Sequence, residues 1–258
     1  YRNLGVNQRN LSKNLEKLSS GFRINRAGDD AAGLAISESM RSQINGLNQA
    51  AKNADDAIGL IQTAEGALTE THSMLQRLKT LATQGANGTY DDTARGNINK
   101  EITDLNAEID RIAESTSFNG VTPLKQNTKF TFQIGATKDE VLKFDCKVTM
   151  DSTGLKINDI TVDDTAAANG AITKIDAAIN SVSAYRAELG AKQNRLEHTV
   201  NNLNVTAENI TAAESRIRDT DMADEMTAFT KNNILSQAAQ SMLAQANAQP
   251  QGILSLLQ

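Results

Sequence analysis

The residues best suited to do chemistry are few and scattered in this sequence. His72 and His198 lie on different predicted helices, without the HExxH spacing or the nearby cysteine that would indicate a zinc site. The glycines and aspartates of residues 28–33 are superficially similar to a phosphate-binding loop, but they lack a Gly-Lys-Ser/Thr ending and a preceding strand. Acidic pairs such as Asp163 and Asp164 are solvated loop charges. The sequence therefore predicts no catalytic, cofactor-binding or metal-binding residues, and a protein that is not an enzyme.

Composition narrows the class of protein further. The 258 residues include 3% aromatics and no Trp, so a compact core built on aromatic side chains is not expected. A net charge of −5 is mild for this length and gives no indication of a nucleic-acid partner. No apolar run is long enough to predict a membrane span. Cys146 is the single cysteine, so an internal disulfide is excluded, and we expect this residue to be half-buried.

A long helical stripe is the strongest structural pattern. Between Ile172 and Ile217, apolar residues recur at spacings of three, four or seven. An unbroken helix of about 45 residues there would be about 70 Å long. A narrow apolar stripe of that length needs partner helices along it. The pattern favours an elongated structural or assembly protein.

The predicted elements are arranged almost symmetrically about the middle of the chain. Because a helix, a break and long helices flank a central strand-rich stretch on both sides, we expect the chain to double back and its ends to pair. The predicted fold is mainly α, an elongated antiparallel helical bundle or coiled coil with a small β-hairpin region and paired termini. The expected helices cover residues 1–20, a segment from Asp29 or Asp30 to 84, about 98–112, about 170–218 and a last segment that starts at 222. We expect Pro250 to limit the last helix. The expected strands lie within 117–165.

The terminal helices are poor in large apolar side chains. Residues 1–20 contain only Leu4, Val6, Leu11, Leu15 and Leu18 as large aliphatics. Full burial of these side chains would contribute roughly 10–15 kcal/mol, whereas ordering the segment costs about 30 kcal/mol. We therefore expect the two terminal segments to order only when other copies of the chain cover them.

One polar stretch, residues 76–84, has a pattern of its own. Leu78 and Ala82 fit the core stripe of their helix. Arg77 and Leu81, four residues apart, would then lie together on another face. We expect this face to be exposed, and geometry alone gives it no assigned role.

The chain resembles bacterial flagellin at many separate points. The stretch from Leu18 to Ile36 is similar to the family's N-terminal signature. Further similar stretches are 53–58, 62–68, 108–112, 118–120, 132–136, 189–195, 215–219, 243–247 and 254–257. About 45 residues separate the third and fourth predicted helices, which resembles a short form of the family without its variable outer domains.

This resemblance implies a structural subunit of the flagellar filament. It implies an inner domain of terminal helices (1–20 with 223–258), a spoke or linker (21–33 with 219–222) and an outer rod domain (34–218, with its β region at about 117–165). The residues implied to pack in the inner core of the filament are Leu4, Leu11, Leu15, Leu18, Met226, Phe229, Leu235, Met242, Leu243, Leu254 and Leu257.

The resemblance also implies partners and a location. The chain would form a helical homopolymer outside the cell, after export through the flagellar type III apparatus, with an export chaperone and a filament cap protein as partners and without membrane insertion. The vertebrate Toll-like receptor for flagellin would contact a motif that is similar here at Gln76, Arg77, Leu81, Gln84 and Glu101, although Lys79 and Thr80 replace a common Arg-Glu pair.

Two alternatives stay open from the sequence. A hook–filament junction protein of the same superfamily would share the chain ends less completely. A host-receptor-binding module would act by binding alone.

Overall fold

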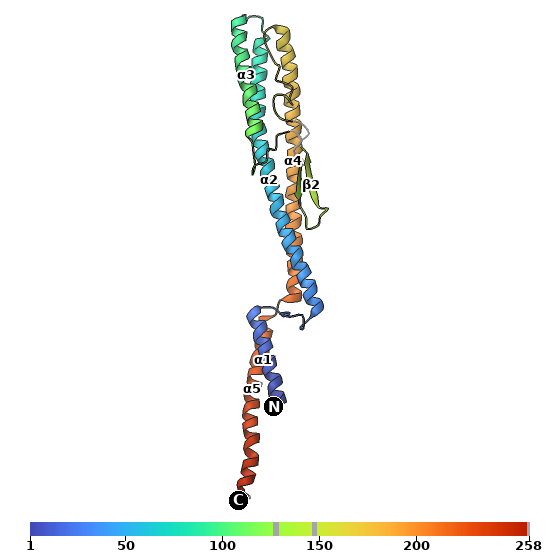
Figure 1. Cartoon of the computed structure of the whole chain (residues 1–258), viewed down its shortest axis with the longest axis vertical. Coiled ribbons are helices and arrows are strands. Elements are labelled where there is room, and N and C mark those ends of the chain that lie inside the picture. The colour runs from blue at the N-terminus through green and yellow to red at the C-terminus, as the bar shows by residue number, and fades with distance from the viewer. Residues whose placement is uncertain (126–128, 146–148, 257–258) are drawn as a thin grey trace. The chain divides into compact units, whose positions relative to one another are not determined.

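The computed structural model describes residues 1–125, 129–145 and 149–256 (Figure 1). Within them the chain is mainly α-helical with one antiparallel two-stranded sheet, which confirms the predicted fold class. The elements in chain order are α1 (Arg2–Ser20), α2 (Ala31–Gly85), α3 (Asp92–Ser115), β1 (Lys129–Gln133), β2 (Val141–Asp145), α4 (Thr165–Arg218) and α5 (Met222–Leu256). Cys146, expected to be half-buried, lies outside the described residues.

The chain divides into two compact units. One unit contains residues 46–205, and the other contains residues 1–45 together with 206–258. The first holds the helical bundle and the β-hairpin, and the second holds the two terminal helices.

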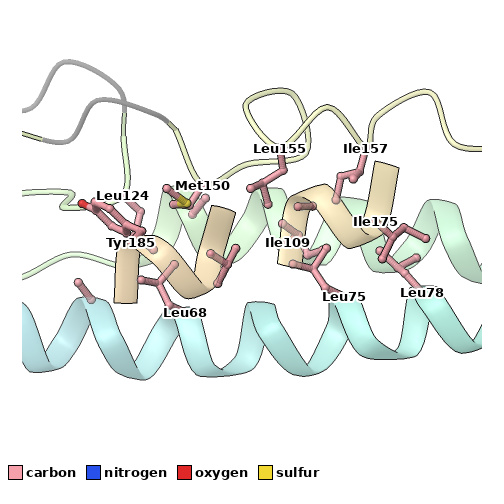
Figure 2. Packing of buried hydrophobic residues seen from close by; sticks show 14 of the residues in the cluster. Leu68, Leu75, Leu78, Ile109, Leu124, Met150, Leu155, Ile157, Ile175 and Tyr185 are labelled. Carbon is pink, nitrogen blue, oxygen red and sulfur yellow. The ribbon is translucent and has the colours of Figure 1, made fainter. Parts of the chain in front are cut away.

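The bundle of residues 46–205 has an aliphatic core. In Figure 1, α3 lies beside α2, and α4 lies along the other side of α2. Leucines of α2 point from this helix toward the side chains of α3 and α4 (Figure 2). Loop residues after β2 cover the remaining side of the core. The buried residues that Figure 2 labels are Leu68, Leu75, Leu78, Ile109, Leu124, Met150, Leu155, Ile157, Ile175 and Tyr185.

The hairpin is attached to the bundle through aromatic and polar contacts. Phe130 of β1 pairs with Phe144 of β2, and their ring centroids are 5.7 Å apart. The Phe144 ring packs near Tyr185 of α4 and lies under the Lys192 ammonium, 4.6 Å from the ring centroid. Much of the predicted strand-rich stretch is loop in the described residues, because its apolar residues pack into the core without pairing as strands.

Short polar side chains and a glycine set the helix ends. The Asp91 carboxylate accepts a hydrogen bond from the Ala94 backbone N–H at 2.9 Å and caps α3. Asp30 does the same for α2 through Gly33, and Asp221 for α5 through Ala223. Helix α1 ends at Gly21, whose φ of 75° is readily adopted only by glycine.

The last helix does not stop at Pro250. The sequence predicted that this proline limits the helix, but α5 continues to Leu256. A proline removes one backbone hydrogen bond and tends to kink a helix. The helical residues on both sides carry the remaining hydrogen bonds, so the local expectation was wrong.

Candidate assembly surface

The terminal helices α1 and α5 pack against each other, as the sequence predicted (Figure 1). The pairing is antiparallel, since Lys17 near the end of α1 reaches Glu225 near the start of α5 at 3.7 Å. Leu4, Leu11 and Leu18 are half-buried in this pair, whereas Leu15 is 58% exposed. One partner helix therefore covers only part of the apolar surface of α1.

A buried asparagine lies at the centre of the α1–α5 contact. Asn14 is 9% exposed and is the buried residue of α1. In the amide orientation that satisfies its neighbours, Nδ2 donates to Glu225 Oε1 at 2.9 Å and Oδ1 accepts from Asn232 Nδ2 at 3.0 Å. Asn14 is not among the residues predicted to pack here, although its spacing of three from Leu11 and four from Leu18 places it on the leucine face.

Helix α5 is apolar on two opposite faces. Phe229 and Leu243 are half-buried and lie on the side of α5 that carries Asn232, toward α1. At 100° per residue, Ile234 falls on the opposite side of the helix. An open groove on that side is lined by Met226, Thr227, Thr230, Lys231, Ile234 and Leu235.

The side chains of this second face are uncovered. Ile234 is 61% exposed, and Met226 and Met242, which lie about 80° to either side of its direction on the helix, are 50% and 70% exposed. A group of exposed large apolar side chains rimmed by polar residues is typical of a contact surface. The uncovered face is therefore a contact surface that the chain itself leaves without a partner within the described residues.

Leu254 lies in the last turns of α5, and Leu257 lies outside the described residues. The packing of all the predicted residues in a polymer stays a prediction.

The segment between α1 and α2 is tied to the segment between α4 and α5. Phe22 forms a β-bridge with Asp219, and the Arg218 guanidinium lies over the Phe22 ring, 4.7 Å from its centroid. Arg218 also donates to Glu38 of α2 at 2.7 Å. Arg23 donates to the Ile217 carbonyl oxygen at 2.6 Å. These contacts hold the two breaks side by side, as the symmetrical arrangement predicted.

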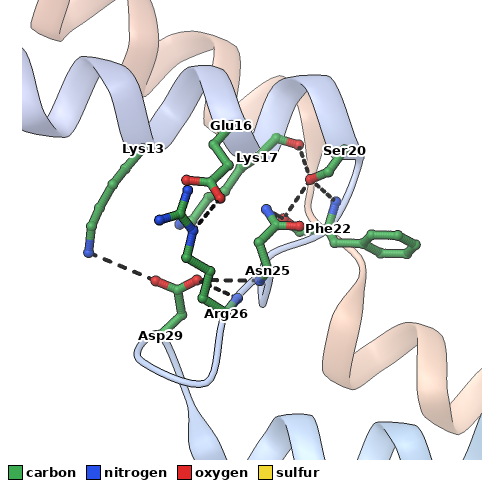
Figure 3. A network of polar contacts seen from close by, with 8 residues as sticks. All are labelled: Lys13, Glu16, Lys17, Ser20, Phe22, Asn25, Arg26 and Asp29. Atoms are coloured by element: carbon green, nitrogen blue, oxygen red, sulfur yellow. Dashed lines mark hydrogen bonds and ion pairs between the residues drawn. The ribbon is translucent and has the colours of Figure 1, made fainter.

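The loop that follows α1 is folded around Asp29 (Figure 3). The carboxylate accepts hydrogen bonds from the backbone N–H groups of Arg26 at 3.1 Å and Asn25 at 3.3 Å. The Arg26 hydrogen bond, with a smaller contribution from Asn25 and Lys13, holds the pKa of Asp29 below its ordinary value. Arg26 also reaches back to Glu16 of α1 at 2.8 Å.

The stretch over residues 76–84 divides between surface and core. Gln76, Arg77 and Gln84 are exposed, and Arg77 Nε donates to Glu101 Oε1 on α3 at 2.7 Å. Leu81 is only 2% exposed, so the expectation of an exposed Leu81 was wrong. Because α3 and α4 flank α2 on two sides, its buried arc is wider than a single stripe. Any receptor contact made by Leu81 would require a structural change.

Neither a metal site nor a membrane span is present in the described part of the chain. No group of three or more His, Cys, Asp or Glu side chains there could hold a metal ion. None of the helices, over the same residues, combines the length and the hydropathy that a bilayer crossing requires. His72 contacts Gln76, one turn away on its own helix, at 3.0 Å.

Comparison with known proteins agrees with this architecture. Residues 1–129 match the bacterial flagellin N-terminal helical region, and residues 172–257 match the bacterial flagellin C-terminal helical region. The chain is 53% identical to a flagellin of Halalkalibacterium halodurans, covering 100% of this chain and 95% of the relative. It is 50% identical to the flagellar filament 33 kDa core protein of Treponema phagedenis, covering 99% and 95% respectively.

A solved structure is also similar. The Bacillus cereus flagellin crystal structure aligns with a TM-score of 0.54 and 33% identity, over 63% of this chain and 94% of that one. The described helices, of which the first and the last pack together, define a mainly α-helical class of protein with paired chain ends. Given the family matches in both halves and the 53% identity over 95% of a relative's length, the chain belongs to the bacterial flagellin family.

Proposed function

We propose that this chain is the structural subunit of a bacterial flagellar filament and assembles as a helical homopolymer for motility. The observation that carries the proposal is the second apolar face of α5, centred on Ile234, which α1 leaves uncovered. Burial of such a face by neighbouring copies supplies a driving force for polymerisation. Family membership and the match at both chain ends favour a filament subunit over a hook–filament junction protein.

The proposed domains follow the family resemblance. Residues 1–20 with 223–258 form the inner domain, 21–33 with 219–222 form the spoke, and 34–218 form the outer rod. The contacts of Phe22, Arg218 and Glu38 support a mechanically coupled spoke, because they join three segments that are distant in sequence. The work of the protein is then mechanical, and it needs no catalytic group.

The proposal includes a location and assembly partners. The chain acts outside the cell in the flagellum and reaches it through the flagellar type III apparatus. An export chaperone covers the terminal helix before assembly, and a cap protein guides insertion at the filament tip. The apolar second face of α5 supports the need for such a chaperone, because an uncovered apolar face favours aggregation.

Electron microscopy of the purified chain tests the filament proposal. We expect to see long helical polymers. Amide hydrogen exchange gives a second measurement, and we expect it to be slow at residues 1–20 in polymers and fast in dilute monomer. Polymerisation shields the α1–α5 pair, which alone buries too little apolar surface to be stable. Discrete caps or persistent monomers at high concentration would contradict the proposal.

The receptor proposal has its own test. The vertebrate Toll-like receptor for flagellin contacts the exposed residues Arg77, Gln76 and Gln84, beside Glu101. We expect Arg77→Ala to lower potency in a reporter-cell assay by about tenfold, since interface arginines are often dominant contacts.

The control for this experiment is Lys52→Ala. Lys52 is also an exposed cation of α2, but it lies many turns before Arg77 and outside residues 76–84. Equal potency of the Arg77 variant and the unchanged protein would remove the proposed contact, and equal losses in both variants would indicate a general structural effect.

A further inference from the structure

The methionines of α5 differ from the others in accessibility. The sequence contains six methionines. The three on α5 are all exposed, with fractions of 47% for Met222, 50% for Met226 and 70% for Met242. In contrast, Met150 is 3% exposed in the bundle core, and Met74 packs against the same core. Thioether accessibility is therefore concentrated on the helix that carries the uncovered apolar face.

We infer that Met222, Met226 and Met242 are oxidation sites of the unassembled subunit, and that their conversion to methionine sulfoxide blocks assembly. The inference rests on the proposed filament function, since it requires that neighbouring copies cover α5. It assigns a modification site and the chemical class of its reagent, a peroxide.

The chemistry needs only the thioether and the peroxide. The sulfur lone pair attacks one oxygen of hydrogen peroxide, a sulfur–oxygen bond forms and the oxygen–oxygen bond breaks. Sulfur loses two electrons, and the second peroxide oxygen leaves as water after proton transfer. Exposure governs which methionines react, so the side chains on α5 react first.

The product no longer suits an apolar contact. A sulfoxide is polar and chiral, whereas the thioether is flexible and apolar. Met226 lines the groove with Ile234 and Leu235, and the groove offers only the polar groups of Thr227, Thr230 and Lys231. Burying the sulfoxide oxygen without a well-placed hydrogen-bond donor is unfavourable. Oxidation therefore weakens the contact before the folded bundle is affected.

Peptide mass spectrometry after peroxide treatment gives the first measurement. The Cys146→Ser variant serves as background, so that thiol oxidation does not contribute. In monomer we expect the α5 methionines to oxidise at least about tenfold faster than Met150, because susceptibility follows exposure. In polymers seeded with sheared filaments, the rate at α5 should fall toward that of Met150. Equal rates at α5 and Met150 in monomer would overturn the inference.

Assembly of the oxidised subunit gives the second measurement. We expect the critical concentration to rise by about tenfold, and treatment with methionine sulfoxide reductases to restore it. The triple variant Met222→Leu, Met226→Leu and Met242→Leu keeps similar volume and should assemble equally before and after peroxide. The control variant Met40→Leu with Met74→Leu should stay as sensitive as the background protein.

The outcomes separate the inference from the proposed function. Three results would overturn the inference but not the filament proposal. In the first, the reductases fail to reverse the rise in critical concentration. In the second, the triple leucine variant shows the same rise after peroxide treatment. In the third, assembly is unchanged after complete oxidation of α5. Failure of untreated protein to polymerise at any concentration overturns the inference together with the filament proposal.

Discussion

Ile234→Asp is expected to raise the critical concentration for filament formation strongly while leaving the folded bundle of residues 46–205 unchanged. Ile234 is 61% exposed and lines the groove on the face of α5 away from Asn232. A carboxylate there is solvated in the monomer but loses its water when another copy covers the groove. Burying an unpaired charge costs about 3 kcal/mol or more, so the critical concentration should rise about a hundredfold or more. Sedimentation of polymer against monomer measures this rise, and circular dichroism checks the monomer.

Gln240→Asp is the matched control for this substitution. Gln240 is an exposed residue of α5, and at 100° per residue it lies well away from the direction of Ile234. The same charge is introduced into the same helix, so a general effect of charge on α5 would appear in both variants. Normal polymerisation of the Ile234 variant would remove the second face of α5 as an assembly surface.

Leu75→Ala is expected to destabilise the bundle by about 3 to 5 kcal/mol. Leu75 is fully buried, among residues of α2, α3, α4 and the loop before α4 (Figure 2). The loss combines the transfer free energy of the deleted carbons with the cavity that a close-packed core only partly closes. Urea unfolding of the monomer, followed by circular dichroism, measures the change in the free energy of unfolding.

The comparison variant for the core is Leu75→Met. Its volume is nearly conserved, so we expect a loss below about 1.5 kcal/mol. A loss below 1 kcal/mol for Leu75→Ala would show that the core around this position is loosely packed. The two leucine substitutions thus separate the effect of cavity formation from the effect of changing the residue type.

Periodicity predicted the helices well but not the width of their buried faces. The stripe from Ile172 to Ile217 lies within α4, and the helix predicted to end at residue 84 ends at Gly85. Leu81, which was expected to be exposed, is buried. An apolar stripe shows which side of a helix faces one neighbour, whereas the number of neighbouring helices sets how much of the helix surface is covered.

The candidate surface was predictable only in part. The sequence indicated amphipathic terminal segments, and three leucines of α1, Leu4, Leu11 and Leu18, are half-buried in its contact with α5. It did not indicate that Asn14 is buried between them, because an asparagine in a leucine stripe becomes satisfied only when Glu225 and Asn232 are brought opposite it. Residues so far apart along the chain become neighbours only in the folded molecule.

The sequence by itself determined which segments are helical and that the two ends pair, because apolar spacing and element lengths can be read from the chain alone. Only the tertiary structure decided which apolar side chains are covered. Burial depends on which helices stand on each side, and that is why Leu81 is buried while Ile234 stays exposed.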